Sequence, residues 1–224
     1  MVKVKDRLKI ALIINLLIVF FEAFALFGTF FNADGSFNWE FLQYYTHYSN
    51  VFVFFSSIYV STELMKKVVS THDMRTNYMA RLLKYMSSCY LTLTFLVVLF
   101  VLVPSNNFRD WKFYLFKKNF IFEHILCPIL AFLSVTVFGD YDDFGTREAG
   151  LAVIPTTLYA VVITILNITR TISGPFEFCK VHNQPWYVSV FWFIGMVGGS
   201  WVINMGILHL SRRMQVSERK SAER

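Results

Sequence analysis

Long apolar stretches follow one another along almost the whole of this 224-residue chain, and they constrain its fold more than any other feature. A helix needs about 20 apolar residues to cross the hydrocarbon core of a bilayer. Six such stretches are present, at roughly 8–31, 43–65, 82–103, 119–138, 150–172 and 186–210. Backbone groups in lipid must satisfy each other's hydrogen bonds, and the short alternating strands of a transmembrane barrel are absent. The sequence therefore predicts an all-α, polytopic membrane protein, in which six transmembrane helices form a bundle with short loops.

The composition agrees with this interpretation. Apolar residues make up 55% of the chain and charged residues only 16%, too little charge to cover so much apolar surface in water. The loops leave no room for a second domain, so residues 1–211 are expected to form a single transmembrane domain. Residues 212–224 are rich in charge, and we expect them to form a cytoplasmic tail without regular structure.

The basic residues are distributed unevenly between the two ends of the predicted helices. Fifteen of the 21 lysines and arginines fall on the side of the N-terminus and six on the other side. Because basic residues gather on the cytoplasmic side of membrane proteins, both termini are expected to be cytoplasmic. The net charge of +6 is scattered over short loops and the tail, which favours attraction to anionic lipid over binding of nucleic acid. We therefore expect a multi-pass integral membrane protein, located in the cell membrane if the chain is bacterial.

No metal and no cofactor are expected. The three cysteines show neither the paired spacing of a zinc site nor a disulfide framework. His47, His124 and His182 are predicted to lie near one level, where two of them can serve as the axial ligands of a b-type haem. No two of these histidines share a helix at a suitable spacing, so the haem hypothesis is the weakest of the alternatives.

Polar residues inside membrane helices are costly, so the few that this chain carries are the candidates for a functional site. Thr46, Ser49 and Asn50 lie near the outer end of the second stretch, at spacings i, i+3 and i+4. This spacing places them on one face of a helix. A Thr or Ser in a membrane helix usually donates to the carbonyl four residues earlier, whereas a buried amide needs partners on other helices. His47 points off this face and is expected at the membrane interface.

His124 opens the fourth stretch, and Pro128 follows four residues later. Consecutive helices alternate in direction, so the second and fourth stretches both begin on the outer side, and His124 is expected at the level of Thr46. Pro128 has no N–H group and cannot bond the carbonyl of His124, so the helix is expected to kink there. Glu123 points about 100° away from His124 around the helix, so it is not an obvious partner for the imidazole ring.

Further polar residues extend the candidate site in the outer half of the bundle. Glu22 lies in the outer half of the first stretch. An isolated buried carboxylate is either protonated or paired, and Arg170 is the candidate partner. Tyr159 and Asn167 share the fifth stretch with Arg170, and His182 leads into the sixth. Together with the polar face of the second stretch, these residues are expected to bind substrate or to support the site.

A hydroxyl and an imidazole at one level can act as a nucleophile and its base. A Thr hydroxyl is a weak nucleophile and needs a base within hydrogen-bond reach, which a neutral imidazole supplies near neutral pH. Asn50 or a Tyr hydroxyl can donate to the oxyanion of a tetrahedral intermediate. No carboxylate third member is evident, so Thr46 and His124 are predicted as a catalytic dyad that takes an acyl group and then passes it to water.

Three segments, 41–50, 124–128 and 154–159, resemble a known family. They are similar to the androgen-induced and androgen-dependent TFPI-regulating protein family and its bacterial relatives, as is the layout of six spans with short loops. The resemblance implies a multi-pass threonine hydrolase of lipid metabolism that cleaves fatty acid esters of hydroxy fatty acids or similar lipid esters. It also implies that Thr46 is the nucleophile and His124 its base. The chain lacks the histidine-rich approach to the catalytic His of the animal members, and the exit of its fifth stretch matches them only loosely.

Two other functions stay open. The polar cluster can be the substrate site of a small-molecule or lipid transporter or of a lipid-binding protein, although no internal repeat of the kind found in many bundle transporters is visible. The chain also resembles a group of membrane acyltransferases that carry a His before a Pro on a helix. Such an enzyme passes its acyl group to a second lipid in place of water. The oligomeric state does not follow from the sequence.

Overall fold

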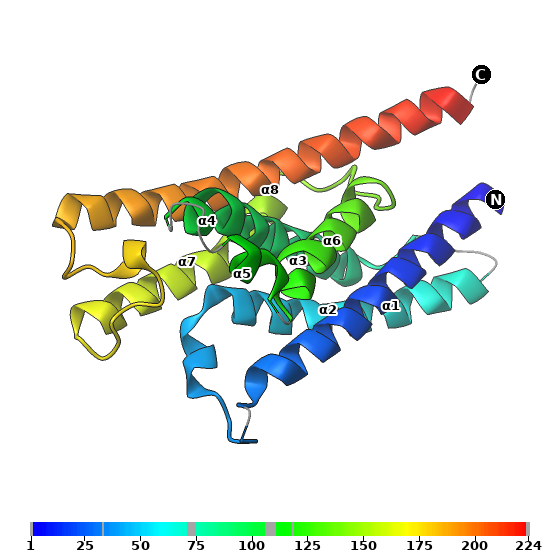
Figure 1. Ribbon diagram of the computed structural model, residues 1–224. Helices are drawn as coiled ribbons and strands as arrows, with labels where there is room; N and C mark the ends of the chain where they lie inside the picture. The colour runs from blue at the N-terminus through cyan, green and yellow to red at the C-terminus, as the bar shows by residue number, and fades with distance from the viewer. Residues whose placement is uncertain (1, 33, 71–74, 106–110, 118, 223–224) are drawn as a thin grey trace.

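The computed structural model describes residues 2–32, 34–70, 75–105, 111–117 and 119–222. Within these ranges the chain is helical and contains no β-strand, apart from an isolated bridge between Phe31 and Phe37. The all-α prediction is therefore confirmed. The helices run back and forth along one direction, and the N- and C-termini lie at the same end of the bundle (Figure 1).

Helical segments occupy all six of the predicted positions. The long helices are α1 (Val2–Phe30), α2 (Tyr45–Val69), α3 (Tyr78–Val97), α6 (Cys127–Thr136), α7 (Thr146–Ile168) and α8 (Trp186–Ala222). Two π-helical segments adjoin them, η2 (Val98–Leu102) after α3 and η3 (Phe122–Leu126) before α6. The remaining elements are short: η1 (Trp39–Gln43), α4 (Val103–Ser105), α5 (Trp111–Phe116) and η4 (Glu177–Cys179).

Four of these helical stretches are long and apolar enough to cross a membrane. They are Lys5–Phe30, Tyr78–Ser105, Thr146–Ile168 and Trp186–Gln215. The stretch Phe122–Thr136 is apolar but shorter than a typical span. The helix α2 is not among the four, although it is long, because its sequence is interrupted by polar residues from Thr46 to Lys67.

The helix α2 turns its polar side chains inward. Its buried residues include Thr46, His47, Ser49, Asn50, Ser56, Ser57, Ser61 and Glu63. The neighbouring helices α1 and α3 pack against it and cover this face. By contrast, large apolar side chains such as Phe20, Phe24 and Phe27 on α1 are exposed, as are Phe191 and Val202 on α8. Apolar side chains outside and polar ones inside are what a bilayer environment requires of a helical bundle.

An apolar layer crosses the middle of the bundle. It is formed by Ile14 and Ile18 from α1, Val53 from α2, Leu91 from α3, and Cys127 with Ala131 from α6. A second apolar cluster joins α3, α7 and α8 around the fully buried rings of Tyr85, Tyr141 and Phe144. The first layer separates the half of the bundle that holds the termini from the half that holds the candidate site.

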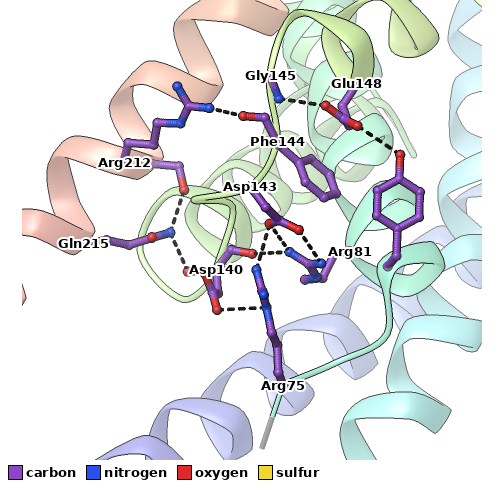
Figure 2. Close-up of polar contacts among 12 residues, drawn as sticks. Arg75, Arg81, Asp140, Asp143, Phe144, Gly145, Glu148, Arg212 and Gln215 are labelled. Carbon is purple, nitrogen blue, oxygen red and sulfur yellow. Dashed lines mark hydrogen bonds and ion pairs between the residues drawn. The ribbon is translucent and has the colours of Figure 1, made fainter.

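A network of ionic and hydrogen bonds closes the end of the bundle that holds the termini (Figure 2). Arg81 at the start of α3 makes two hydrogen bonds to the carboxylate of Asp143, at 2.5 and 2.9 Å, and its guanidinium lies over the ring of Phe144. Arg212 of α8 donates to the main-chain carbonyl of Phe144. The loop between α6 and α7 is therefore held by both α3 and α8.

The helix α8 differs from the expectation. The charged region after Ser211 was expected to lack regular structure, but α8 continues as a helix to Ala222. Gln215 is still in contact with the bundle, because its side-chain amide donates to the Gly139 carbonyl at 2.8 Å. The expectation of an unstructured tail directly after Ser211 is therefore wrong: contacts to the loop between α6 and α7 stabilise another turn of helix.

Candidate functional site

Thr46 is the second residue of α2 and is buried. The preceding element η1 ends at Gln43, and Tyr44 follows in an extended conformation, so the carbonyls before Thr46 do not continue the helix. The Leu42 carbonyl, four residues earlier, accepts a hydrogen bond from the Tyr48 hydroxyl at 2.8 Å. Thr46 therefore begins its helix without the usual acceptor for its own hydroxyl.

Other threonines of the bundle show the contrast. The hydroxyls of Thr136, Thr157 and Thr164 each donate to the carbonyl four residues earlier, at 2.8, 3.1 and 2.7 Å. This is the ordinary structural role of threonine in a membrane helix. Among the described residues, the hydroxyl of Thr46 makes no hydrogen bond of this kind, so it is left for another acceptor.

His124 lies within the π-helical segment η3 and is buried. The Cys127 N–H bonds the carbonyl of Phe122 five residues earlier, and Pro128 follows directly, without an N–H to restore the α-helical pattern. The structure thus has a widened, π-helical turn before this proline, and the expected kink stays a prediction. Single π-helical turns are frequent at functional sites. The imidazole also stacks on the ring of Phe120, with centroids 4.9 Å apart.

The tautomer of His124 follows from its hydrogen bond. Its Nδ1 atom lies 2.5 Å from the main-chain carbonyl oxygen of Tyr114. A carbonyl can only accept, so Nδ1 carries the hydrogen, and in the neutral ring Nε2 keeps the lone pair. The carbonyl therefore fixes both the orientation of the imidazole ring and its tautomer.

Thr46 and His124 lie in the same half of the bundle, but no hydrogen bond joins Thr46 Oγ1 to the imidazole of His124 in the described structure. Ser49 and Asn50 share the Thr46 face. The Ser49 hydroxyl donates to the Thr46 carbonyl at 2.7 Å and lies 3.3 Å from the Thr94 hydroxyl. Asn50 is fully buried, and neither its side-chain oxygen nor its nitrogen has a partner. The catalytic dyad therefore stays a prediction.

A largely apolar cavity of about 460 Å³ opens beside Ser49, between α2, α3 and α7. Tyr45, Phe52, Tyr90, Tyr159 and Val162 are among its lining residues. The Tyr159 hydroxyl donates to the Gln43 carbonyl at 2.7 Å, so Tyr159 connects α7 to the end of η1, just before α2. A cavity of this size and lining suits the hydrocarbon part of a lipid.

Three of the predicted supporting residues hold the turn after α7. Asn167 donates through Nδ2 to the Ile172 carbonyl and accepts at Oδ1 from the Val181 N–H. His182 bonds through Nε2 to the carbonyl of Asn167 at 3.1 Å. Arg170 is exposed and adopts a positive φ of 58° in the turn itself. The side chains of Asn167 and His182 bond main-chain groups, and the main-chain N–H of Arg170 donates to the Asn167 carbonyl, so these contacts are those of a helix end.

Glu22 is fully buried on α1, and the expected pairing with Arg170 is wrong, because Arg170 is exposed at the end of α7. The neighbours of Glu22 are Glu123 and Cys127. The Cys127 thiol satisfies neither carboxyl oxygen of Glu22: a thiol is a weak donor, and no hydrogen bond of standard geometry joins the two groups.

Two further residues of this half, His47 and Glu123, were not expected in the site. His47 is buried and stacks on Phe41, with centroids 4.7 Å apart, so the expectation of an interfacial His47 is wrong. Its Nδ1 atom lies 3.8 Å from Oε2 of Glu123, which is itself fully buried. A signal was present in the sequence: His47 and Asn50 are three residues apart and so are neighbours on the helix surface, and Glu123 interrupts an apolar run.

The candidate site thus comprises Thr46, His124, the cavity beside Ser49, and the buried group of Glu22, His47 and Glu123. Among the residues that the structure describes, no group of His, Cys, Asp and Glu side chains has the arrangement of a metal site. No protein-family model matches this chain, and neither a curated protein nor a solved structure matches it.

Proposed function

We propose that the protein is an intramembrane hydrolase that cleaves lipid esters, with Thr46 as nucleophile and His124 as base. Fatty acid esters of hydroxy fatty acids, or similar lipids, are the proposed substrates, in keeping with the resemblance of segments 41–50 and 124–128 to threonine hydrolases. The bond from His124 Nδ1 to the Tyr114 carbonyl is the observation that carries the proposal. It leaves Nε2 with a lone pair, which a general base needs.

The reaction runs in two steps. In the first, Thr46 Oγ1 attacks the ester carbonyl carbon while its proton passes to His124 Nε2, and the tetrahedral intermediate then expels the alcohol, which takes that proton from Nε2. In the second, His124 removes a proton from water and the resulting hydroxide attacks the acyl-Thr46 ester. The fatty acid is then released as Thr46 Oγ1 leaves and takes the proton back from His124 Nε2. Catalytic hydrogen bonds often tighten only when substrate binds, so the Thr46 hydroxyl is expected to reach Nε2 in the substrate complex.

The cavity beside Ser49 is proposed to hold the acyl chain. It adjoins the helix that carries Thr46, and most of its lining is apolar. Burial of a hydrocarbon chain contributes about 0.8 kcal/mol per methylene group, so a cavity of this kind favours long acyl chains over short ones. Asn50, whose side-chain amide has no partner, is the proposed donor to the oxyanion.

We further infer six membrane spans with both termini in the cytoplasm, in a cell membrane if the chain is bacterial. Helical segments at all six positions support this count. The two segments that fall short of span criteria, α2 and Phe122–Thr136, pack between the others, where neighbouring helices cover their polar groups. The excess of basic residues on the side of the termini supports the orientation.

The test is hydrolysis of a fluorogenic long-chain lipid ester by the purified protein in detergent or nanodiscs. Thr46→Ala and His124→Ala are each expected to lower kcat/KM by about 10³-fold or more, because nucleophile and base act as one unit. A fluorophosphonate probe is expected to label the wild-type protein and to lose its signal in Thr46→Ala.

Matched variants make the test specific. Thr136→Ala removes a threonine whose hydroxyl is used on its own helix, and His209→Ala removes an exposed histidine of α8. Both are expected to keep wild-type activity and labelling. Full activity of folded Thr46→Ala, with normal gel filtration and circular dichroism, would rule out the proposed nucleophile.

A transporter or lipid-binding protein is the second candidate. The buried carboxyl groups of Glu22 and Glu123 favour it, because ionisable groups inside a bundle often mark ion-coupled sites. A membrane acyltransferase is a variant of the first proposal. It is distinguished by adding a lipid alcohol, which in an acyltransferase diverts the acyl group from water to a new ester.

A further inference from the structure

A polar layer lies directly outside the apolar layer that crosses the bundle. Ile18, Val53 and Cys127 belong to the apolar layer and come from α1, α2 and α6. The helix α1 runs antiparallel to α2 and α6, so one turn toward the candidate site is a step forward in α1 and a step back in the other two. This step leads from Ile18 to Glu22, from Val53 to Asn50 and from Cys127 to Glu123. All three are fully buried. Three helices thus contribute a carboxyl, an amide and a second carboxyl at one level.

This layer contains polar atoms that the protein leaves without partners. Both carboxyl oxygens of Glu22, both polar side-chain atoms of Asn50, Oε2 of Glu123 and Nδ1 of His47 have no hydrogen bond. Buried polar atoms normally have a hydrogen-bond partner, so buried polar atoms without one indicate a functional role or a bound ion. Glu22 and Glu123 are both fully buried and near enough to interact electrostatically, and two such carboxyl groups cannot both be ionised at low cost.

The contacts of Thr29 bear on the protonation of Glu123. The Thr29 hydroxyl oxygen lies 2.8 Å from the Ala25 carbonyl oxygen and 2.9 Å from Glu123 Oε1. A hydroxyl has one hydrogen, and the first contact is the ordinary bond to the carbonyl four residues earlier. If Thr29 donates to Ala25, a hydrogen bond to Oε1 requires that the carboxyl group of Glu123 supplies the proton.

No cation balances these carboxyl groups in the described structure. The titratable groups beside them are His47 from α2 and Cys127 from α6, and His124 interacts with His47. Lys84 is a buried amine of α3, but it lies seven residues before Leu91 of the apolar layer. It is therefore near Arg7, toward the end of the bundle that holds the termini. A histidine or a cysteine carries no fixed positive charge, so the described structure places no permanent cation beside these carboxyl groups.

We propose that Glu22 and Glu123 form a proton-binding site in the membrane-spanning part of the bundle, with the bound proton between Glu123 Oε1 and Thr29 Oγ1. The ligand is a proton and not a metal ion, because the described acidic, histidine and cysteine side chains do not converge in a metal arrangement. The site is independent of the ester chemistry of Thr46, since it uses residues of α1 and η3 that the proposed reaction does not require.

Infrared spectroscopy of the purified wild-type protein tests the proposal without any lipid ester. A protonated carboxyl group in a dry environment has a carbonyl-stretching band well separated from that of ionised carboxylates, and it shifts on exchange into D₂O. We expect this band at neutral pH in the wild-type protein and its loss in Glu123→Gln. Glu22→Gln is expected to reduce or shift the band, because it removes the facing carboxyl.

The control is Glu63→Gln. Glu63 is also buried, but both of its carboxyl oxygens accept hydrogen bonds, from Lys66 at 2.6 Å and from Asn77 at 2.9 Å, so this substitution is expected to leave the band unchanged. If a variant does not fold, the site is assigned in the wild-type protein by peptide mapping after treatment with dicyclohexylcarbodiimide. This apolar reagent enters the bilayer and modifies protonated carboxyl groups, so an adduct on Glu123 or Glu22 is expected.

Three results would overturn the proposal. One is a wild-type protein without the carboxylic acid band at neutral pH. Another is a band that survives unchanged in folded Glu123→Gln and Glu22→Gln. The third is loss of the band when Na⁺ replaces choline at constant pH, which would show that the carboxyl groups bind a metal cation in place of a proton.

Discussion

His47 Nδ1 lies 3.8 Å from Glu123 Oε2, so the residue of α2 that faces the acidic side chain of η3 is a histidine and not Thr46. Glu123 precedes His124 in the sequence, and the two point in different directions: Glu123 toward α1 and His47, and His124 toward the carbonyl of Tyr114. The candidate site therefore has two parts, one for the proposed ester chemistry and one for the proposed proton.

The cavity beside Ser49 predicts how chain-length selectivity will respond to mutation. Val162→Trp on α7 is expected to fill the cavity, because Val162 is one of its lining residues. KM for a long-chain ester should rise about tenfold or more, while kcat and the kinetics of a short-chain ester change little. The neighbouring Val161, which is exposed and does not line the cavity, provides the matched control Val161→Trp. Equal effects of Val162→Trp on both esters would argue against an acyl-chain site there.

Two buried glutamates should respond to mutation in opposite directions. Glu22 is fully buried without a hydrogen bond, so Glu22→Met is expected to raise the free energy of unfolding by about 1 to 3 kcal/mol. Glu148 accepts hydrogen bonds from the Gly145 N–H at 2.7 Å and the Tyr78 hydroxyl at 3.1 Å, so Glu148→Met should lower it by about 1 to 2 kcal/mol. Thermal unfolding in one detergent measures both. A destabilised Glu22→Met would show that this carboxyl has a partner which stabilises the fold.

The pair of Arg81 and Asp143 is expected to stabilise the end of the bundle that holds the termini. The guanidinium of Arg81 is buried, whereas the Asp143 side chain is 44% exposed. Arg81→Met should lower the free energy of unfolding by on the order of 2 kcal/mol, between the values for exposed and buried pairs. A double-mutant cycle with Asp143→Asn isolates the coupling, and additive effects of the two changes would contradict a direct interaction.

The same pair predicts the acid response of the fold. Hydrogen bonds from Arg81 lower the pKa of Asp143 below its ordinary value of 3.8. Because the pKa of Asp143 is lower in the folded state than in the unfolded state, its ion pair stabilises the fold fully at pH values above the unfolded-state pKa. This stabilisation is lost as the pH falls through the folded-state pKa. The unfolding temperature of the wild-type protein should therefore fall between neutral pH and about pH 3 more steeply than that of Asp143→Asn. Parallel pH profiles would exclude Asp143 as a source of the acid sensitivity.

The helix positions could be predicted because apolar runs report directly on burial in lipid. The runs at 8–31 and 150–172 correspond to α1 and α7. The candidate site was less predictable, because side-chain partners depend on how helices rotate against one another. Counting residues along α2 identified the Thr46 face, but it could not show that His47 turns inward toward Glu123. It also could not show that a main-chain carbonyl, that of Tyr114, orients His124.

By itself, the sequence determined a helical fold with apolar helices long enough to cross a membrane and a few polar residues within them, because hydropathy and helical spacing are local properties. Only the tertiary structure decided which polar groups meet. Glu22 lies beside Glu123 and not beside Arg170, and the Thr46 hydroxyl has no acceptor on its own helix. The physical reason is that such contacts are set by the packing of side chains between helices that are far apart in the chain, and no local pattern encodes that packing.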